Sequence, residues 1–306
     1  MSRFRNENPS ADRNLRDVLR WATTRRPQPW PKWIETGVRY EPRSPGADEV
    51  LLTFVNHSTF LLQWREVAVL TDPVWSLRVS PVQWSGPARV HAPGIAFDYL
   101  PNVDVVLVSH NHYDHMDLAT LRRLQQRSAC QIVTTLGNRA YLEARGLRHV
   151  MELGWWQTAQ ARGLQITATP AQHFSARTPF DRNRTLWAGF VLATATRRVF
   201  YTGDSGYHTH FADIRRRLGP VDAALIPIGA YDPRWFMSVN HMNPEEAVRA
   251  HLDLGSPLSV AMHFGCFQLT DEPIDEPVRE LARARDAHGV AATAFRVLEP
   301  GETLAI

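Results

Sequence analysis

Hydrophobic and polar residues follow two different rhythms along the chain. Near the start, apolar residues recur at i, i+3, i+4 and i+7 from Leu15 to Ala22, which predicts an amphipathic helix over about residues 11–25. The proline-rich stretch "RRPQPWPKW" then ends it. We therefore expect residues 1–40 to form a helix followed by a proline-rich arm.

Beyond this arm, short apolar runs separated by turn residues predict strands. The runs "EVLLTFVNHSTFLLQW" and "EVAVLTDPVW" are typical of strands joined by tight turns, and "VDVVLV" is typical of a strand buried on both faces. Later runs, from "QIVTT" to "LSVAMHF", alternate with helices such as "NPEEAVRAHLDLG". Hairpins followed by alternating strands and helices, twice over, predict an α/β protein with two packed sheets and helices outside. We expect residues 41–306 to form a single domain.

The composition is that of an ordinary globular protein. Hydrophobic residues make up 44% of the 306 residues and charged residues 21%. No run approaches the roughly 20 apolar residues of a membrane span, and no apolar segment follows the basic N-terminus, so no secretory signal is expected. Cys130 and Cys266 are too few for a disulfide framework; we expect both to be reduced and the protein to be cytoplasmic. The net charge is only +3 and the arginines are scattered, so no nucleic-acid partner is expected.

The stretch "SHNHYDHMD" directly follows the buried strand "VDVVLV" and crowds four ligand-type side chains together. These are His110, His112, Asp114 and His115. Imidazole nitrogen and carboxylate oxygen together suit zinc, iron or manganese rather than calcium. A single catalytic metal normally takes three protein ligands and a water, so four candidates favour a site for two metals.

More ligands are available where other apolar runs stop. His173 follows "LQITATPAQ", Asp204 follows "RRVFYTG" and His263 follows "LSVAM". A lone histidine at a strand end is more often a satisfied polar residue, but the cluster before it makes ligation the better interpretation. His57 in "VNHSTF" and Asp72 in "LTDPVW" also end strands, and we expect them to support the ligands. A turn formed by Asp-Pro is an equally good account of Asp72.

The tetrapeptide "GDSG" at 203–206 resembles the nucleophile motif of chymotrypsin-like serine proteases. Tyr207 replaces the next glycine of that motif, and no G-x-S-x-G occurs elsewhere. A carboxylate between two metals explains Asp204 better, and Ser205 is then a small turn residue.

With these residues placed, the chain resembles the metallo-β-lactamase superfamily and, within it, the N-acyl-phosphatidylethanolamine-hydrolysing phospholipase D family. The likeness is carried, in order, by "LTDPVWSLRVSP", "SHNHYDHMD", "PAQHFSART", "TGDSGYH", "PIGAYDPRWFMSVNHMNPEEAV" and "HFGCFQLTDEP". It implies an αββα sandwich with a dinuclear site, most often two Zn2+ per chain, with Mn2+ or Fe2+ as alternatives. The resemblance implies the following ligands: His110, His112 and His173 for one ion, Asp114, His115 and His263 for the other, and Asp204 as a bridge.

The sequence also departs from the family. Cys266 stands where relatives commonly have threonine, and Asn240 precedes His241 where vertebrate members have glutamine. In the N-terminal region only "RFRNENPS" and "PWPKW" look related. Proteins resembling ascorbate-6-phosphate lactonase share the same motifs, so the likeness defines the catalytic machinery more closely than the substrate.

The function that this resemblance favours is a phosphodiesterase acting on N-acyl-phosphatidylethanolamine-like lipids or related small phosphodiesters. Two cations about 3.5–4 Å apart lower the pKa of a shared water toward about 7 and so provide hydroxide at neutral pH. Asp114 is expected to orient this water and accept its proton, and Asp204 and His241 are the other catalytic candidates. A lactonase or amidase of the same fold is the alternative. A nucleic-acid processing nuclease ranks last, because it needs a basic face and usually a clamp domain.

Two segments are candidates for contact with substrate or membrane. Tyr231, Arg234 and Trp235 are expected to bind substrate: Arg234 can fork onto a phosphate and Trp235 can line an apolar groove, although loop packing explains these residues equally well. The helix over residues 11–25 carries arginines beside apolar residues, which suits peripheral contact with an anionic membrane. Packing of this helix on the domain is the favoured alternative.

Overall fold

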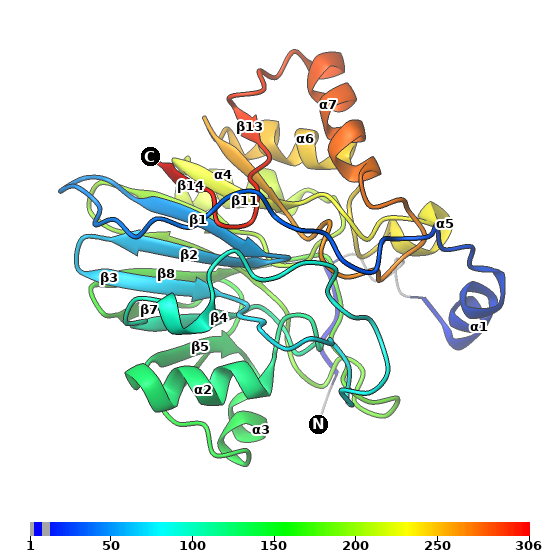
Figure 1. The fold of residues 1–306 in the computed structure, drawn as a ribbon, viewed down its shortest axis with the longest axis horizontal. Helices are drawn as coiled ribbons and strands as arrows, with labels where there is room; N and C mark the ends of the chain where they lie inside the picture. The colour runs from blue at the N-terminus through cyan, green and yellow to red at the C-terminus, as the bar shows by residue number, and fades with distance from the viewer. Residues whose placement is uncertain (1–2, 8–12) are drawn as a thin grey trace.

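Two mixed sheets form the centre of the computed structural model, which describes residues 3–7 and 13–306 (Figure 1). The first sheet has the strand order β14-β1-β2-β3-β4-β5-β6. Its strands are β1 (Leu51–Asn56), β2 (Thr59–Trp64), β3 (Val67–Thr71), β4 (Val105–Val108), β5 (Gln131–Thr135), β6 (Val150–Leu153) and β14 (Thr303–Ala305). Strands β3 to β6 run parallel, whereas the pairs β14–β1, β1–β2 and β2–β3 are antiparallel.

The second sheet repeats this plan, with the strand order β13-β12-β11-β10-β9-β8-β7. Its strands are β7 (Thr158–Ala161), β8 (Leu164–Thr169), β9 (Gly189–Ala193), β10 (Arg198–Tyr201), β11 (Ala223–Pro227), β12 (Ser259–Met262) and β13 (Phe295–Arg296). Strands β7 to β10 are antiparallel and β10 to β13 are parallel. Each sheet therefore combines a hairpin part with a parallel part.

Helices cover the outer faces of both sheets (Figure 1). The helices of the described chain are α1 (Leu15–Thr24), α2 (Leu118–Ser128), α3 (Arg139–Glu143), α4 (His210–Leu218), α5 (Arg234–Met237), α6 (Pro244–Leu254) and α7 (Glu276–His288), together with the short 3-10 helix η2 (Phe97–Tyr99). α1 lies apart from both sheets and packs against α5 (Figure 1). α2 and α3 pack on the first sheet, and α4, α6 and α7 pack on the second. The order helix, sheet, sheet, helix is the αββα sandwich expected from the resemblance.

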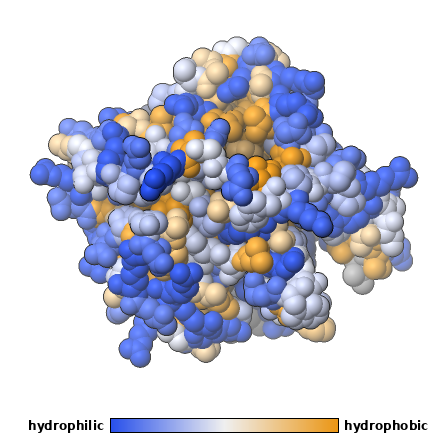
Figure 2. All heavy atoms as spheres, viewed as in Figure 1, coloured by the Kyte–Doolittle hydropathy of each residue, from blue (hydrophilic) through white to orange (hydrophobic). Residues whose placement is uncertain are grey.

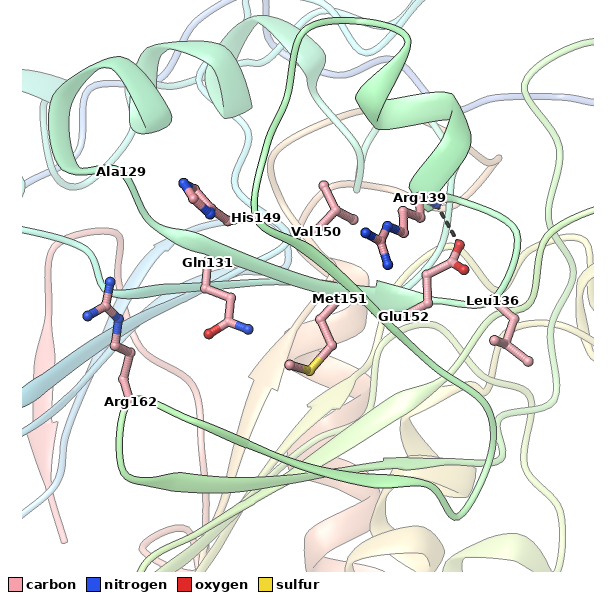
Figure 3. Close-up of a pocket in the computed structure, with 9 residues that line it drawn as sticks. All are labelled: Ala129, Gln131, Leu136, Arg139, His149, Val150, Met151, Glu152 and Arg162. Carbon is pink, nitrogen blue, oxygen red and sulfur yellow. Dashed lines mark hydrogen bonds between the residues drawn. The ribbon is translucent and has the colours of Figure 1, made fainter.

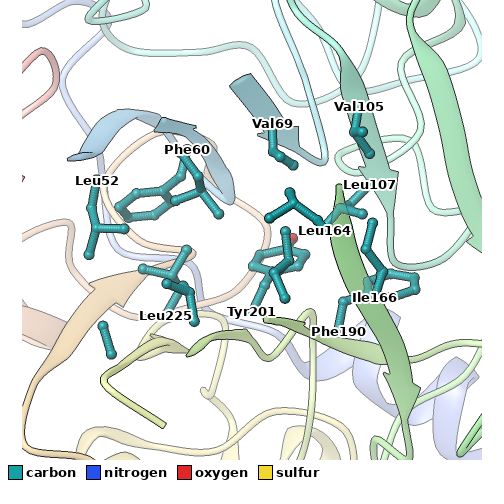
Figure 4. Packing of buried hydrophobic residues seen from close by; sticks show 14 of the residues in the cluster. Leu52, Phe60, Val69, Val105, Leu107, Leu164, Ile166, Phe190, Tyr201 and Leu225 are labelled. Atoms are coloured by element: carbon teal, nitrogen blue, oxygen red, sulfur yellow. The ribbon is translucent and has the colours of Figure 1, made fainter. Parts of the chain in front are cut away.

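The main core lies between the sheets, where alternate side chains of each strand meet (Figure 4). In β4, Val105 and Leu107 face this core, whereas Val106 and Val108 face the layer of α2. Both faces of β4 are thus buried, which explains why its sequence is a continuous apolar run. The strand holds the start of the ligand-rich loop rigidly in place.

The polar residues predicted at strand ends gather at one edge of the sandwich. β1, β3, β4, β10 and β12 run in the same direction within their sheets, so the loops that follow them emerge on the same side. The segments after β4, β10 and β12 carry His110, Asp204 and His263. The fold therefore brings together residues far apart in the sequence.

Three expectations about the elements need correction. The first helix begins at Leu15, not near residue 11, because Asn14 caps it with a reciprocal hydrogen-bond pair to Asp17; residues 11 and 12 lie outside the described part of the chain. The strand expected in "LQITATPAQH" ends at Thr169, so His173 is not at the strand end. The segment around Arg234 and Trp235, which was expected to be a loop, contains the single helical turn α5. In the described chain, no helix is long and apolar enough to cross a membrane.

Candidate metal centre

Three histidine rings converge at one side of the centre. The Nε2 atom of His110 lies 2.8 Å from Nδ1 of His112, and Nε2 of His173 lies 3.3 Å from the same Nδ1. Nitrogens that bind one tetrahedral ion at about 2.0–2.1 Å lie roughly 3.3 Å apart. The spacing therefore suits one shared ion, with small adjustments.

A second group lies beside the first. Oδ2 of Asp114 is 3.3 Å from Nε2 of His115 and 3.4 Å from Nε2 of His263. The same oxygen is 3.1 Å from Nε2 of His57. His57 therefore lies within hydrogen-bond distance of the Asp114 carboxylate and can support it, as expected from its position at a strand end.

Asp204 stands between the two groups. Its Oδ2 lies 3.1 Å from Nε2 of both His115 and His263. The same oxygen lies 3.9 Å from Nε2 of His110 and 3.7 Å from Nε2 of His173. A single carboxylate oxygen within reach of both groups is the arrangement that a bridging ligand requires.

The donor atoms fit a pair of divalent transition-metal ions. Buried polar atoms nearly always have hydrogen-bond partners, and those without one need an explanation. Several buried atoms aimed into this centre have none: His115 Nε2, His263 Nε2 and Asp204 Oδ1. Ligation would satisfy these atoms, and a mixed set of imidazole and carboxylate donors suits zinc, manganese or iron.

Asp72 anchors the centre from behind. It is fully buried, and its Oδ2 accepts hydrogen bonds at 2.5 Å from His115 Nδ1 and from the hydroxyls of Ser109 and Tyr201. Its Oδ1 accepts from the backbone N–H of Ser109 at 2.7 Å. With the proton of His115 held on Nδ1, Nε2 is free to face the centre. Asp72 is therefore more than an Asp-Pro turn.

Arg177, which the sequence interpretation missed, holds the loop that carries four of the ligand candidates. Its Nη1 donates to the carbonyl of Asn111 at 2.8 Å and to that of Met116 at 2.9 Å. Its guanidinium lies 4.0 Å from the ring centre of Tyr113, whose hydroxyl donates back to the Arg177 carbonyl at 3.1 Å. The only signal in the sequence was its place inside "PAQHFSART".

The charged side chains of the centre shift one another's pKa values. Burial alone would lower the pKa of His263, but the carboxylates of Asp204 and Asp114 outweigh burial and raise it to about 9. The same balance holds the pKa of His115 well above its ordinary value. Burial would raise the pKa of Asp204, yet His115 and His263 hold it well below the usual range. Protons and metal ions would therefore compete for the same nitrogens.

The other histidines of the centre are neutral at pH 7. Burial lowers the pKa of His57 to about 3 and those of His112 and His241 to about 4. The ring of His241 lies 5.0 Å from that of His173 and 5.4 Å from that of His263. His241 is partly exposed, so it lies at the mouth of the centre.

Two of the expected substrate residues have partners of their own. The hydroxyl of Tyr231 donates to Glu276 on α7 at 2.7 Å. Arg234 donates to Glu246 on α6 at 2.7 Å and to the carbonyl of His241 at 2.9 Å. The structure therefore does not bring these two groups to the metal cluster. Arg234 instead fixes the segment that carries His241.

Trp235, the third expected substrate residue, lies under the N-terminal helix. The Arg20 guanidinium is 4.5 Å from its ring centre, and Trp21 stacks on the neighbouring Phe236 with ring centres 5.1 Å apart. Arg13 also donates to the Phe236 carbonyl at 3.1 Å. These aromatic residues pack α5 against α1, which agrees with the loop-packing alternative.

Ser205 is fully buried in the turn that follows β10. Its Oγ accepts from the backbone N–H of Gln172 at 2.9 Å, donates to the Gly206 carbonyl at 2.7 Å and lies 3.1 Å from Nε2 of the buried His210. With its hydroxyl enclosed and bonded to the backbone on both sides, Ser205 fits the interpretation as a turn residue.

The backbone around the centre is strained. His57, Asp72 and His263 have positive φ values of 45°, 32° and 59°. A residue other than glycine in this region costs on the order of 1–3 kcal/mol, and such strain clusters at functional sites. Gly229 passes so close to His263 that a Cβ atom there would lie 2.2 Å from the His263 carbonyl oxygen. The fold tolerates strain and close approach to place these side chains.

A groove of about 730 Å3 lies away from the metal centre (Figure 3). It runs along β5 and β6, and its lining includes Gln131, His149, Met151 and Arg162. Arg139 at its wall donates its backbone N–H to Glu152 at 2.6 Å. No residue of the metal centre lines this groove.

Comparison with known proteins gives consistent matches. Residues 68–264 match the family model described as a beta-lactamase superfamily domain. The N-acyl-phosphatidylethanolamine-hydrolyzing phospholipase D 1 of Caenorhabditis elegans is 34% identical over 263 residues, which are 82% of this chain and 74% of that protein. The mitochondrial enzyme of the same name from Saccharomyces cerevisiae is 33% identical over 75% of this chain and 50% of its own length.

A Mycobacterium tuberculosis protein described as uncharacterized is 42% identical over 249 residues, 80% of this chain and 66% of that protein. The chain thus spans just under two thirds of that relative. Among solved structures, Igni18, a metallo hydrolase from Ignicoccus hospitalis, superimposes with a TM-score of 0.64 at 24% identity, covering 84% of this chain and 98% of that one. This structural likeness supports the fold.

Proposed function

The chain belongs to the metallo-β-lactamase superfamily and is a metal-dependent hydrolase, and from this premise we propose that it is a phosphodiesterase of phospholipase D type. Its substrates would be N-acyl-phosphatidylethanolamine-like lipids or related small phosphodiesters. The observation that carries the proposal is the pair of ligand groups joined by one oxygen of Asp204. The relatives in nematode and yeast support the choice of a phosphodiester.

In this proposal, His110, His112 and His173 would hold one divalent ion, Asp114, His115 and His263 would hold the other, and Asp204 would serve both. When bound, two such ions lower the pKa of a shared water and offset the negative charge of a phosphodiester. Zinc is the proposed metal, with Mn2+ and Fe2+ as alternatives that the same donors accept.

The protein side chains then orient and move protons. Asp114 is the most exposed carboxylate of the centre, with 13% of its side chain accessible, and its low pKa keeps it ionised, so that it can orient a water molecule by accepting a hydrogen bond from it. His57 holds the Oδ2 atom of Asp114 in place. His241 is neutral at pH 7 and partly exposed, so it can hydrogen-bond to substrate at the mouth.

The test is hydrolysis by metal-loaded protein of a panel containing N-acyl-phosphatidylethanolamine in mixed micelles, small phosphodiesters, a lactone and a β-lactam. Run in 18O-labelled water, phosphodiester cleavage should place the label on the phosphate product, because water attacks phosphorus. Label on a carboxylate product instead would indicate a lactonase or amidase. Turnover of the lactone with none of the phosphodiesters would overturn the proposal.

We also propose that α1 contacts an anionic membrane while it packs on α5. Leu19 and Val18 of α1 are 57% and 37% exposed, and Figure 2 shows an apolar area on this helix among hydrophilic residues. Basic residues beside apolar ones suit an interfacial helix. Cys130 and Cys266, both buried and unpaired, support the cytoplasmic side of such a membrane.

A further inference from the structure

The side chain of Asn6 binds the backbone of a metal-ligand candidate 167 residues away in the sequence. Its Nδ2 donates to the carbonyl of His173 at 2.8 Å, and its Oδ1 accepts from the His173 N–H at 3.2 Å. The same Oδ1 accepts from Nε1 of Trp187 at 3.0 Å. Asn6 is only 7% exposed, so these bonds form in a buried site where their geometry is well defined.

His173 needs such a partner because of its place in the fold. β8 ends at Thr169, so no neighbouring strand binds the N–H and C=O of His173. The carboxamide of Asn6 supplies one acceptor and one donor to this residue, as a neighbouring strand would. A second hydrogen bond, from the Phe4 N–H to the Asn183 carbonyl at 2.9 Å, connects the same N-terminal segment to the loop that follows His173.

The ring of His173 is fixed separately. Its Nδ1 lies 3.0 Å from the carbonyl of Asn240, which can only accept a hydrogen bond, so Nδ1 carries the proton. Nε2 is then free to ligate, and it points toward His112 and Asp204. Backbone and ring are thus held by two different asparagines from opposite parts of the chain.

We propose that Asn6 is a positioning residue of the metal centre, which fixes the His173 backbone so that Nε2 reaches the ion shared with His110 and His112. This role concerns assembly of the centre and is independent of the substrate. The proposal predicts that loss of the Asn6 side chain weakens the binding of only one of the two ions. The other ion site rests on Asp114, His115 and His263, and Asp72 and His57 buttress it without any contact to Asn6.

The variant Asn6→Ala tests this role in the full chain. Metal-free protein is titrated with Co2+, whose visible absorption reports ligand geometry, and the ions are then removed by a competing chelator. The wild type should bind two ions. Asn6→Ala should bind one with unchanged affinity and the other about 10- to 100-fold more weakly, the usual effect of losing a group that orients a ligand. The absorption of the weakened site should change as well.

Asn138→Ala is the matched control. Asn138 is also a buried asparagine, and its Nδ2 bonds only to Thr134 and Thr135, outside the metal centre. This variant should lower the melting temperature while leaving both Co2+ affinities and spectra unchanged. If it shows the same selective loss, the effect reports general stability and the proposal is wrong.

Asn6→Asp keeps the test decisive if the alanine variant does not fold. The aspartate has the same shape, but it loses the Nδ2–H donor and sets a carboxylate oxygen against the His173 carbonyl. We expect the same selective weakening of one ion. Wild-type affinity and spectrum for both ions in either Asn6 variant would overturn the proposal.

Discussion

At the scale of single residues, the centre depends on one oxygen atom of Asp204 that lies 3.1–3.9 Å from four imidazole nitrogens. We expect Asp204→Asn to lower hydrolysis by more than about 100-fold, since loss of a direct ligand should exceed the 10- to 100-fold effect of residues that only orient ligands. Folding should change little, because the amide has the same shape.

Elemental analysis, steady-state kinetics and thermal unfolding of the Asp204→Asn variant would check this. Normal turnover with full metal content would show that Asp204 has only a structural role. Ser205→Ala is the control from the neighbouring position, and it should retain its metal ions.

Metal loading should also release protons. The carboxylates of Asp204 and Asp114 raise the pKa of His263 to about 9 and hold that of His115 well above its ordinary value, so both rings favour the protonated form. Each must become neutral to ligate, so binding should release about two protons and should tighten as pH rises toward 9. Calorimetric titrations in two buffers of different ionisation enthalpy would measure this number. Equal heats in both buffers would contradict it.

The spacing of residues allowed the ligand candidates to be predicted, because the dense motif and the strand-end positions are both written in the sequence. The substrate candidates could not be predicted in the same way. The partners of Tyr231 and Arg234 are Glu276 and Glu246, which stand on helices whose packing only the fold defines. The contact between Asn6 and His173 could not be predicted either, because the two residues lie 167 positions apart and only the fold brings them together.

At the scale of elements, the ligand loop after β4 depends on Arg177. Arg177→Met keeps an apolar stem of similar length but removes the bonds to the Asn111 and Met116 carbonyls. Because the loop supplies ligand candidates to both groups, we expect both ions to bind about tenfold more weakly. Chelator competition would measure the change, with Arg139→Met on α3 as a control.

The loss of affinity for both ions in Arg177→Met would differ from the result for the Asn6 variants, which should bind only one of the two ions more weakly. Unchanged affinity for both ions would show that the loop keeps its shape without the guanidinium.

Most elements could be predicted from the pattern of apolar residues, since the continuous apolar run of β4 and the regular apolar spacing of α6 are both present in the sequence. The errors lie where tertiary contacts override local pattern. The apolar run "LQITATPAQ" predicts a strand as far as His173, but β8 ends at Thr169, because a bridge between Gln172 and Gly206 and the Asn6 carboxamide shape the residues that follow it.

At the scale of the whole molecule, the exposed part of α1 should govern vesicle binding. We expect Leu19→Asp to reduce co-sedimentation with anionic vesicles at low salt by several-fold, while hydrolysis of a soluble phosphodiester stays unchanged. Leu252→Asp is a matched control, because Leu252 is a leucine of α6 that is 46% exposed. If the wild type ignores vesicles at every salt concentration, α1 serves only packing.

Point variants suit this experiment better than removal of the N-terminal region. Residues of that region bind His173 through Asn6 and Asp271 through Arg25, so a truncated protein would lose support of the metal centre together with α1.

The same long-range hydrogen bonds determine when the N-terminal residues can reach their native contacts during synthesis. Asn6 leaves the ribosome 167 residues before His173, which is roughly 8–33 s at about 5–20 residues per second. The delay between the synthesis of Arg25 and that of its partner Asp271 is longer still, because the two are 246 residues apart. Residues translated early are therefore among the last to reach their native contacts, and a nascent chain gains its capacity to hold both ions only after translation has passed His263.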